Sequence, residues 1–590
     1  MNVNTLVIIG YFILMLIISL SFKKMASKSS SDYFRGGGRM LWWMVGATAF
    51  MTQFSAWTFT GAAGKAFSDG FAVTFVFFGN ALGYLVSWWW FSHRFRQMRV
   101  DTPTEGVRAR FGKTNEQFFT WAIIPLSILT GGVWLNGLAI FVSAVFGFEL
   151  PLTIWITGIS VLLISMLSGA WGVVASDFVQ TLIIAVVSVA CAIVALVVVG
   201  GPGEIVENFP GGFIMGPDMN YGVLLVGSFL FFLVKQLQSI NNMQDSYRFL
   251  NAKDSRNARN AALFAMALMS VGSLIWFIPA WSSAILIPDA AVEYSGLGKK
   301  ARDAVYLVFA EKIMPVGTVG LLVGGLFAAT MSSMDSALCR NAGIFVRSFW
   351  SPIIRRNQPQ SEKGLLITSQ VVTVINGILV IIIAQLFAQL KELSLFELMM
   401  RVATLLQSPI LVPLFFGMFI RKTPRWAAWG TVCFGMLVSW LVINVFTAQW
   451  AASLFDITLT ARERSELTTT MTVAAHLLFT GGFFCLTTLF YRPSAFSPVE
   501  RENAEQFFEN IESPVIADDQ QGEFDRIQQY KLGSITQLMG YGILLMVLIP
   551  NPLWGRIVFL GCAASILLIG YFLKRSGTLK HSKTPPVTAK

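Results

Sequence analysis

Ala328–Ala329–Thr330–Met331–Ser332–Ser333–Met334–Asp335–Ser336 lies inside an apolar segment that runs from about residue 318 to about residue 350. Such a segment is helical inside a bilayer, because no water is present there to satisfy free backbone N–H and C=O groups. Small and hydroxyl residues at the i, i+3, i+4 and i+7 positions share one helix face: Ala329, Ser332, Ser333 and Ser336. Asp335 borders this face. Hydroxyl and carboxylate oxygens are the ligands that small hard cations prefer, so the stretch predicts an intramembrane cation site.

Two structural alternatives remain open for the same residues. Ser and Ala also let two membrane helices approach closely, without any ligand. Asp335 could instead form an ion pair with Arg340 or Arg347 further along the segment. An acid in the bilayer costs about 2.5–3.5 kcal/mol on insertion scales and usually marks an ion or substrate path, which favours the cation site.

The composition indicates a polytopic membrane protein. Of the 590 residues, 55% are hydrophobic and only 13% are charged, which excludes an ordinary soluble domain. The net charge of +11 agrees with basic cytoplasmic loops and does not require a nucleic-acid partner. The five cysteines have no metal-ligand spacing and are expected to be small apolar side chains: Cys191, Cys339, Cys433, Cys485 and Cys562.

Basic residues after alternate apolar segments set the expected topology. Lys23 and Lys24 follow the first segment, which places the N-terminus outside, and about 14–15 spans follow in all. We expect an extra N-terminal helix with a cytoplasmic loop (1–39), a transport core (40–425), two additional membrane helices (426–490), an acid-rich cytoplasmic loop (491–533), a C-terminal membrane hairpin (534–575) and a disordered tail (576–590).

Two of the predicted spans are interrupted by polar runs, at about 52–60 and 235–245. About five predicted helices separate the interruptions, so the second repeat would enter the membrane from the opposite side. Paired broken helices of this kind indicate the binding site of a secondary transporter, because unwound carbonyls and helix ends can bind ions and solute.

The sequence resembles the sodium:solute symporter family over about residues 4–490. The resemblance is carried by Ser31–Asp32–Tyr33–Phe34–Arg35–Gly36–Gly37–Gly38–Arg39, by Ser55–Ala56 with Gly61 and Gly64, by Ser176–Asp177–Phe178–Val179–Gln180, by Ala329–Thr330–Met331–Ser332–Ser333 and by Phe415–Phe416–Gly417–Met418–Phe419. It implies an all-α membrane protein with a LeuT-like five-plus-five inverted repeat and extra flanking helices.

The same resemblance implies two sodium sites. The principal site would use the carbonyls of Met51, Phe54 and Ala329 and the hydroxyls of Ser332 and Ser333. A second site, found in some members, would use Asp177, Ser332, Asp335 and Ser336. Asp335 is an acid where the family usually has Ser or Thr. Two carboxylates there would bind a cation more tightly, or one would stay protonated through like-charge repulsion, and both interpretations remain open.

Most candidate solute contacts are side chains of the two interrupted spans, and Asn80 and Arg401 come from other predicted spans. The set implied by the resemblance is Gln53, Trp57, Thr58, Asn80, Lys235, Gln238, Ser239, Asn242 and Arg401. Lys65, Lys235 and Arg401 put basic groups near this route. A buried cation usually has a partner, so either the solute is acidic or these groups pair internally, with Asp245 or Asp335. Trp57 could stack on a ring, gate the pocket or serve packing alone.

These observations predict a secondary transporter of the cell membrane and no enzyme. It would couple sodium entry to uptake of a small organic solute (a sugar, sugar acid or other carboxylate) by alternating access. The expected partners are sodium, the solute and the lipid bilayer, with no nucleic acid and no required oligomer. One alternative is a membrane-embedded enzyme that uses Asp177 and Asp335, although no His or Cys partners them and no HExxH or GxSxG stretch occurs. Another is a solute sensor that retains a carrier fold.

Overall fold

The computed structural model describes residues 3–26, 35–356, 358, 361–517 and 522–578. Within these ranges it contains 13 helices long and apolar enough to cross a membrane, and a shorter apolar helix, Leu150–Leu163. One of the 13, Thr58–Gln97, changes direction at Gly70 and so holds parts of two predicted passes. Ser31–Phe34 of the family-like motif and residues 579–590 of the predicted tail lie outside the described residues.

The first broken helix consists of α3 (Trp42–Gln53), a π-helical turn (Thr58–Ala62) and α4 (Ala63–Asp69). Phe54 is extended, with φ −118° and ψ 130°, so α3 ends there. The Ser55 hydroxyl accepts a hydrogen bond from the Trp57 N–H at 3.2 Å and replaces a helical partner. The predicted interruption at 52–60 is therefore present but centred on two residues, Phe54 and Ser55.

The second broken helix consists of α11 (Gly222–Ile240), a 3₁₀ turn (Gln244–Ser246) and α12 (Tyr247–Leu250). The Asn242 side-chain oxygen accepts hydrogen bonds from the backbone N–H groups of Gln244 at 2.9 Å and Asp245 at 3.2 Å, as in an Asx turn. The polar run from Lys235 to Ser239 remains helical, so only the end of the predicted interruption is unwound.

The hydroxyl-bearing segment forms α16 (Thr318–Ile344), whose residues are all buried. It lies inside the helix bundle in both views, against α1 (Val3–Ala26), α3, α8 (Lys113–Phe146) and α9 (Leu150–Val199). Small residues permit this close packing: a Cβ at Gly320 would lie 2.9 Å from Val7 of α1. The remaining helices around the core are α5 (Thr74–Val86), α6 (Ser92–Gln97), α7 (Pro103–Phe111), α13 (Ser255–Ile275), α14 (Ile278–Leu286), α15 (Val305–Ile313), α17 (Glu362–Ala388), α18 (Leu395–Arg401) and α19 (Ser408–Phe416).

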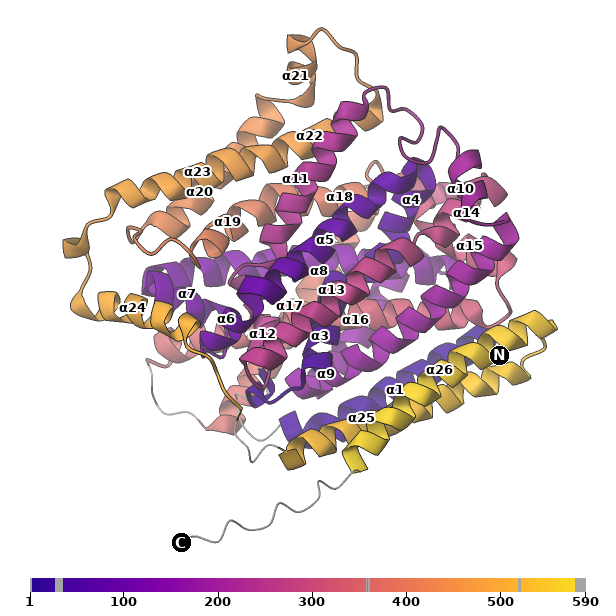
Figure 1. Cartoon of the computed structure of the whole chain (residues 1–590), viewed down its shortest axis with the longest axis horizontal. Coiled ribbons are helices and arrows are strands. Elements are labelled where there is room, and N and C mark those ends of the chain that lie inside the picture. Colours follow the sequence, from indigo (N-terminus) through magenta and orange to yellow (C-terminus); the bar gives the residue numbers. More distant parts are fainter. Residues whose placement is uncertain (1–2, 27–34, 357, 359–360, 518–521, 579–590) are drawn as a thin grey trace.

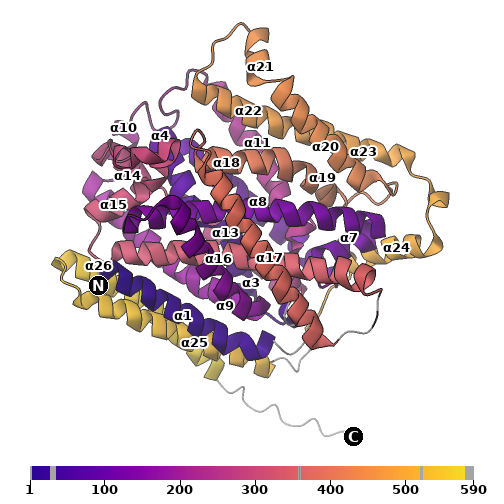
Figure 2. The ribbon, with the colours of Figure 1, turned by 180° about the vertical axis from the view of Figure 1, so that it is seen from behind.

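Further helices flank this core. α20 (Ala427–Asn444) and α22 (Ala461–Ala475) pack beside α11 and α19, and α24 (Pro498–Glu512) lies within the predicted acid-rich loop. α25 (Gly522–Leu545) and α26 (Leu553–Thr578) run alongside each other and α1 at one edge of the molecule (Figures 1 and 2). α25 thus begins before the predicted hairpin at 534, and α26 extends to residue 578, three residues into the predicted disordered tail.

Candidate functional site

The break in α3 faces the hydroxyls of α16. The Ser333 Oγ lies 3.0 Å from the Phe54 carbonyl oxygen and 3.2 Å from the Met51 carbonyl oxygen. One turn earlier on α16, the Thr330 Oγ1 accepts a hydrogen bond from the Ala56 N–H at 3.3 Å. The interruption therefore turns two carbonyls toward one hydroxyl, away from water. This is a hard-oxygen ligand set of the kind predicted for a small cation.

The other predicted ligands of this site lie on the same helix. Ala329 and Ser332 are fully buried in α16. The Ser332 Oγ is buried and has no hydrogen-bond partner among the described residues. A buried polar atom without a partner is costly, which fits an oxygen whose partner is an ion. The structure thus brings Met51, Phe54 and Ser333 together and leaves Ser332 available beside them.

A second group of buried oxygens surrounds Asp177 of α9. The hydroxyls of Thr48 and Ser332 are its polar neighbours, but neither makes a hydrogen bond of normal geometry with the carboxylate. The Ser336 Oγ and the Asp335 Oδ2 are likewise buried without a hydrogen-bond partner in the described part of the chain. The other carboxylate oxygen of Asp335 accepts a hydrogen bond from Ser165.

The alternative ion pairs of Asp335 are not formed. Arg340 donates a hydrogen bond to the Ser127 hydroxyl at 3.0 Å, and Arg347 pairs with Asp101 at 2.5 Å. No ion pair found within the described ranges includes Asp335. Asp177 and Asp335 are buried carboxyl groups without a basic partner. Their negative charge therefore favours a bound cation or proton at this position.

A central cavity of about 100 Å³ lies between the two broken helices. Five of the predicted solute contacts line it: Gln53, Trp57, Asn80, Lys235 and Ser239. The other four do not. Thr58 is buried in the π-helical turn, Gln238 is buried on α11 and Asn242 is buried in the second break. Arg401 lines a separate outer cavity.

Several cavity residues were not predicted, and Arg340 is the most consequential. It is seven residues beyond Ser333, two turns along the same face of α16. The helical spacing in the sequence therefore indicates that Arg340 shares a face with Ser333. Gln236 links two predicted contacts: it accepts from the Lys235 Nζ at 2.8 Å and donates to the Asn80 Oδ1 at 2.8 Å.

The charges around the central cavity do not balance. Asp245 is committed to Arg248, with which it forms an ion pair at 3.0 Å. Gln53 also binds Arg248. In the amide orientation that satisfies both groups, the Gln53 side-chain oxygen accepts a hydrogen bond from the Arg248 guanidinium at 2.9 Å. Lys235 and Arg340, both under a tenth exposed, form no ion pair with any described residue. The sequence left two alternatives for the basic groups, an acidic solute or internal pairing with Asp245 or Asp335. Lys235 does not form the internal pair.

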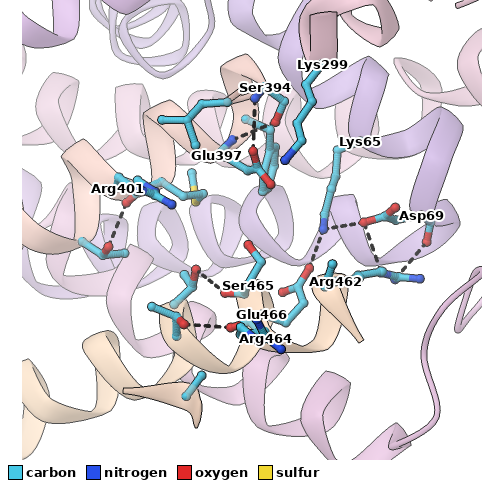
Figure 3. Close-up of a pocket in the computed structure, with 18 of the residues that line it drawn as sticks. Lys65, Asp69, Lys299, Ser394, Glu397, Arg401, Arg462, Arg464, Ser465 and Glu466 are labelled. Atoms are coloured by element: carbon cyan, nitrogen blue, oxygen red, sulfur yellow. Dashed lines mark hydrogen bonds and ion pairs between the residues drawn. The ribbon is translucent and has the colours of Figure 1, made fainter. Parts of the chain in front are cut away.

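Lys65, unlike Lys235, is paired with carboxylates. Its amine pairs with Asp69 at 2.5 Å and also with Glu466 of α22, and Arg462 pairs with Asp69 at 3.2 Å. This ion-pair cluster joins α4 of the core to the flanking helix α22 (Figure 3). For Lys65, internal pairing is the arrangement that the structure contains.

A larger outer cavity of about 630 Å³ lies beyond Trp57. Trp57 stacks on Phe396 with ring centroids 5.5 Å apart, and its indole N–H donates to the Leu395 carbonyl at 3.2 Å. Phe396 lines the outer cavity, Trp57 lines the central one and Met400 lines both. The aromatic pair therefore forms part of a partition between the two cavities, in which Trp57 packs against Phe396, and the gating role of Trp57 stays a prediction.

One titratable group outside the membrane helices sits at the rim of the outer cavity. Asp303, in the 3₁₀ segment Val292–Ala304, is buried and accepts a hydrogen bond from the Leu395 N–H at 3.2 Å. Burial raises the pKa of Asp303 to about 7, against the opposing effects of the Leu395 hydrogen bond and of nearby Lys300. Its charge therefore changes near neutral pH.

Comparison with known proteins places this geometry in context. The sequence model of the sodium:solute symporter family matches residues 33–438. The sodium/sialic acid symporter SiaT of Proteus mirabilis is 24% identical over 474 residues, which cover 77% of this chain and 90% of that protein. The sodium/glucose cotransporter of Vibrio parahaemolyticus is 24% identical over 424 residues, which cover 68% of this chain and 77% of that protein.

A solved structure shares the fold. The substrate-bound, outward-open structure of a Na⁺-coupled sialic acid symporter superimposes with a TM-score of 0.61 at 18% identity, covering 84% of this chain and 99% of that one. At this identity the likeness concerns the fold alone.

Proposed function

The chain belongs to the sodium:solute symporter family, and from Lys235 and Arg340, which line the central cavity without an ion pair to any described residue, we propose that its solute is a small organic anion. Sodium-coupled symport of a small solute across the cell membrane is its activity, and it is a multi-pass transporter rather than an enzyme. The observation that carries the anionic solute is the pair Lys235 and Arg340, which face the central cavity without a carboxylate partner in the described chain.

Buried cations favour a ligand that supplies the missing charge. A carboxylate between Lys235 and Arg340 would accept charge-assisted hydrogen bonds, which are about twice as strong as neutral ones. A neutral polyol would leave both cations unpaired in a site largely shielded from water. The sialic acid symporters among the relatives are named for a sugar acid, which supports this choice, whereas the glucose and myo-inositol cotransporters are named for neutral solutes.

We propose that the principal sodium ion binds at Met51, Phe54, Ala329, Ser332 and Ser333. The support is the approach of two carbonyls of the α3 break to the Ser333 hydroxyl. An ion there would hold the two halves of the broken helix against α16. A ligand changes the balance between outward and inward states only by binding one of them better, so this bridge between two elements is what couples the ion to alternating access.

We propose a second cation site at Asp177, Ser332, Asp335 and Ser336. Asp177 would supply the charge, Ser332 would be shared with the first site, and Asp335 would be oriented by Ser165. The stoichiometry has an electrical consequence. One sodium with one monovalent anion moves no net charge, so the membrane potential, worth about 2.3 kcal/mol per charge at 100 mV, would act only if a second sodium enters.

We also propose a division of the chain into a transport core and flanking segments. Residues 40–425 form the transport core, 426–490 add two membrane helices, and the segments 1–39, 491–533 and 534–575 flank them. We propose that one chain suffices for transport and that no nucleic acid takes part.

The decisive experiment is transport by the purified full-length protein. A thermal-shift screen of sialic acid, gluconate, pyruvate, glucose and myo-inositol, with sodium or choline, selects solutes. Uptake into proteoliposomes under an inward sodium gradient then follows. We expect sodium-dependent stabilisation and accumulation of a carboxylate. Accumulation of glucose or myo-inositol alone would refute the anionic solute, and binding without accumulation would indicate a sensor.

A further inference from the structure

The outer cavity has a distinctive distribution of charge. Its walls come from α4, the segment Val292–Ala304, α18 and α22 (Figure 3). Carboxylates and basic groups both line it, so its net character depends on which of them are already paired. The Lys65 cluster described above uses both Asp69 and Glu466.

Two further carboxylates of the wall are engaged by backbone. Glu397 accepts a hydrogen bond from the Ser394 N–H at 3.1 Å in a capping box at the start of α18. Asp303 accepts from the Leu395 N–H at 3.2 Å. Glu397 and Asp303 are therefore hydrogen-bonded to the backbone at the start of α18 and form no ion pair with the basic groups of the cavity.

Four basic side chains of the wall are exposed and form no ion pair with any residue that the structure describes: Lys299, Arg302, Arg401 and Arg464. They come from three elements, and Lys299 and Arg401 reach into the cavity from different sides (Figure 3). Among the described wall carboxylates, exposed Asp218 alone makes no side-chain hydrogen bond or ion pair. The unengaged groups of this cavity are thus predominantly positive.

This cavity precedes the central one on the route from outside. The two share Met400 and are separated by the Trp57–Phe396 pair. The central cavity, about 100 Å³, is much smaller than the outer one, about 630 Å³. An incoming solute therefore meets Lys299 and Arg401 before it meets Lys235 and Arg340.

We propose that the outer cavity is an anion-capture subsite, in which Lys299 and Arg401 hold the carboxylate of the solute before the partition opens. The inference rests on the proposed anionic solute and adds a second, outer binding step to it. Exposed cations in a concave site concentrate anions and can raise association rates by about tenfold or more, and salt screens this effect. Arg401, predicted to be part of the central pocket, acts in this outer step instead.

The test measures sodium-driven uptake of radiolabelled sialic acid by proteoliposomes, at constant sodium and with choline chloride to vary ionic strength. The variants are Lys299→Gln, Arg401→Gln and the double substitution, with Arg401→Lys as the charge-preserving variant. Arg556→Gln, an exposed change on α26 away from the cavity, is the matched control. Thermal unfolding of each variant verifies that it is folded.

The expected result is a KM about tenfold higher for the double variant at low ionic strength, with an unchanged maximal rate. Arg401→Lys should retain most of the wild-type KM, and high ionic strength should remove the difference between wild type and variant. An unchanged KM at low ionic strength, or a loss confined to the maximal rate, would overturn the capture step while leaving the anionic solute in place. If wild-type protein takes up no carboxylate under a sodium gradient, the proposed function fails and the capture step fails with it.

Discussion

The Ser333 hydroxyl lies 3.0 Å from the carbonyl oxygen of Phe54, across 279 residues of sequence. This contact joins the hydroxyl face of α16 to the break in α3, and it places a side chain from the second repeat against the first. It therefore connects the proposed ion site to the interrupted helix.

Removing this hydroxyl should impair sodium binding specifically. We expect Ser333→Ala to lower the apparent sodium affinity at least tenfold, because a ligand oxygen is lost from a buried site. Sodium titration of tryptophan fluorescence and of uptake would measure it. Ser369→Ala is the matched control, since that buried hydroxyl bonds only to the Leu365 carbonyl of its own helix. Unaltered sodium dependence in Ser333→Ala would place the ion elsewhere.

The two buried acids should have separable roles in stoichiometry. We expect Asp177→Asn to abolish the second cation, so that uptake of a monovalent anion no longer responds to membrane potential. Uptake at imposed potassium–valinomycin potentials measures this. Asp335→Asn retains an acceptor for Ser165 and should keep a larger share of the response. The assignment is wrong if uptake by Asp177→Asn remains as voltage-sensitive as that of wild type.

The cations of the central cavity should decide solute charge. Hydrogen bonds to charged groups contribute about 1.5–3 kcal/mol, so Lys235→Gln and Arg340→Gln should each raise the KM for a carboxylate by about 10- to 100-fold. The KM for any neutral solute should change far less. Competition by neutral and acidic solutes against the same tracer compares the two. Equal losses for both classes would indicate that these residues serve the structure instead.

The outer ion-pair cluster should stabilise contact between α4 and α22. Glu466→Gln removes one of the two partners of Lys65 and should cost about 1–3 kcal/mol, seen as a lower thermal midpoint. The exchange Lys65→Glu with Glu466→Lys should recover part of that loss, although Asp69 then opposes the new acid. A double-mutant cycle on thermal midpoints isolates the pairwise contribution. Strict additivity of the two single changes would argue against the pairing.

Asp303 should make stability depend on pH. Its folded pKa of about 7 lies above the ordinary value of 3.8, so the folded protein binds the proton more tightly than the unfolded chain. The stabilisation is complete below about pH 4 and is lost as the pH rises through 7. Asp303→Asn should remove this dependence and raise stability at pH 8 by up to about 4 kcal/mol, since the amide oxygen can still accept from Leu395.

Thermal unfolding at several pH values measures the effect of this substitution. Asp289→Asn, an exposed change in the same outer region, is the control. A parallel pH profile for Asp303→Asn and wild type would contradict the assignment.

The fold and the hydroxyl-bearing face of α16 follow from local patterns. Hydroxyls at helical spacing predict one face of α16, and polar runs in apolar spans predict both breaks, because each pattern is a property of a single segment. The solute cavity depends on several segments at once. Gln236 lines it through the packing of α11 against α5, which no single segment encodes.

The predicted contacts that do not line the central cavity have local causes. Asn242 caps the turn after the second break with its own side chain. Thr58 lies in a π-helical turn, where an extra residue per turn changes which side chains face the cavity. Arg401 lies at the last residue of α18 and lines the outer cavity instead.

The indole of Trp57 is tied to the backbone of Leu395 and stacked on Phe396, both at the start of α18. Admission of a solute must therefore separate that helix end from the first broken helix before the deeper chamber can enlarge. Breaking the contacts of Trp57 with Leu395 and Phe396 would then be one step of the transport cycle.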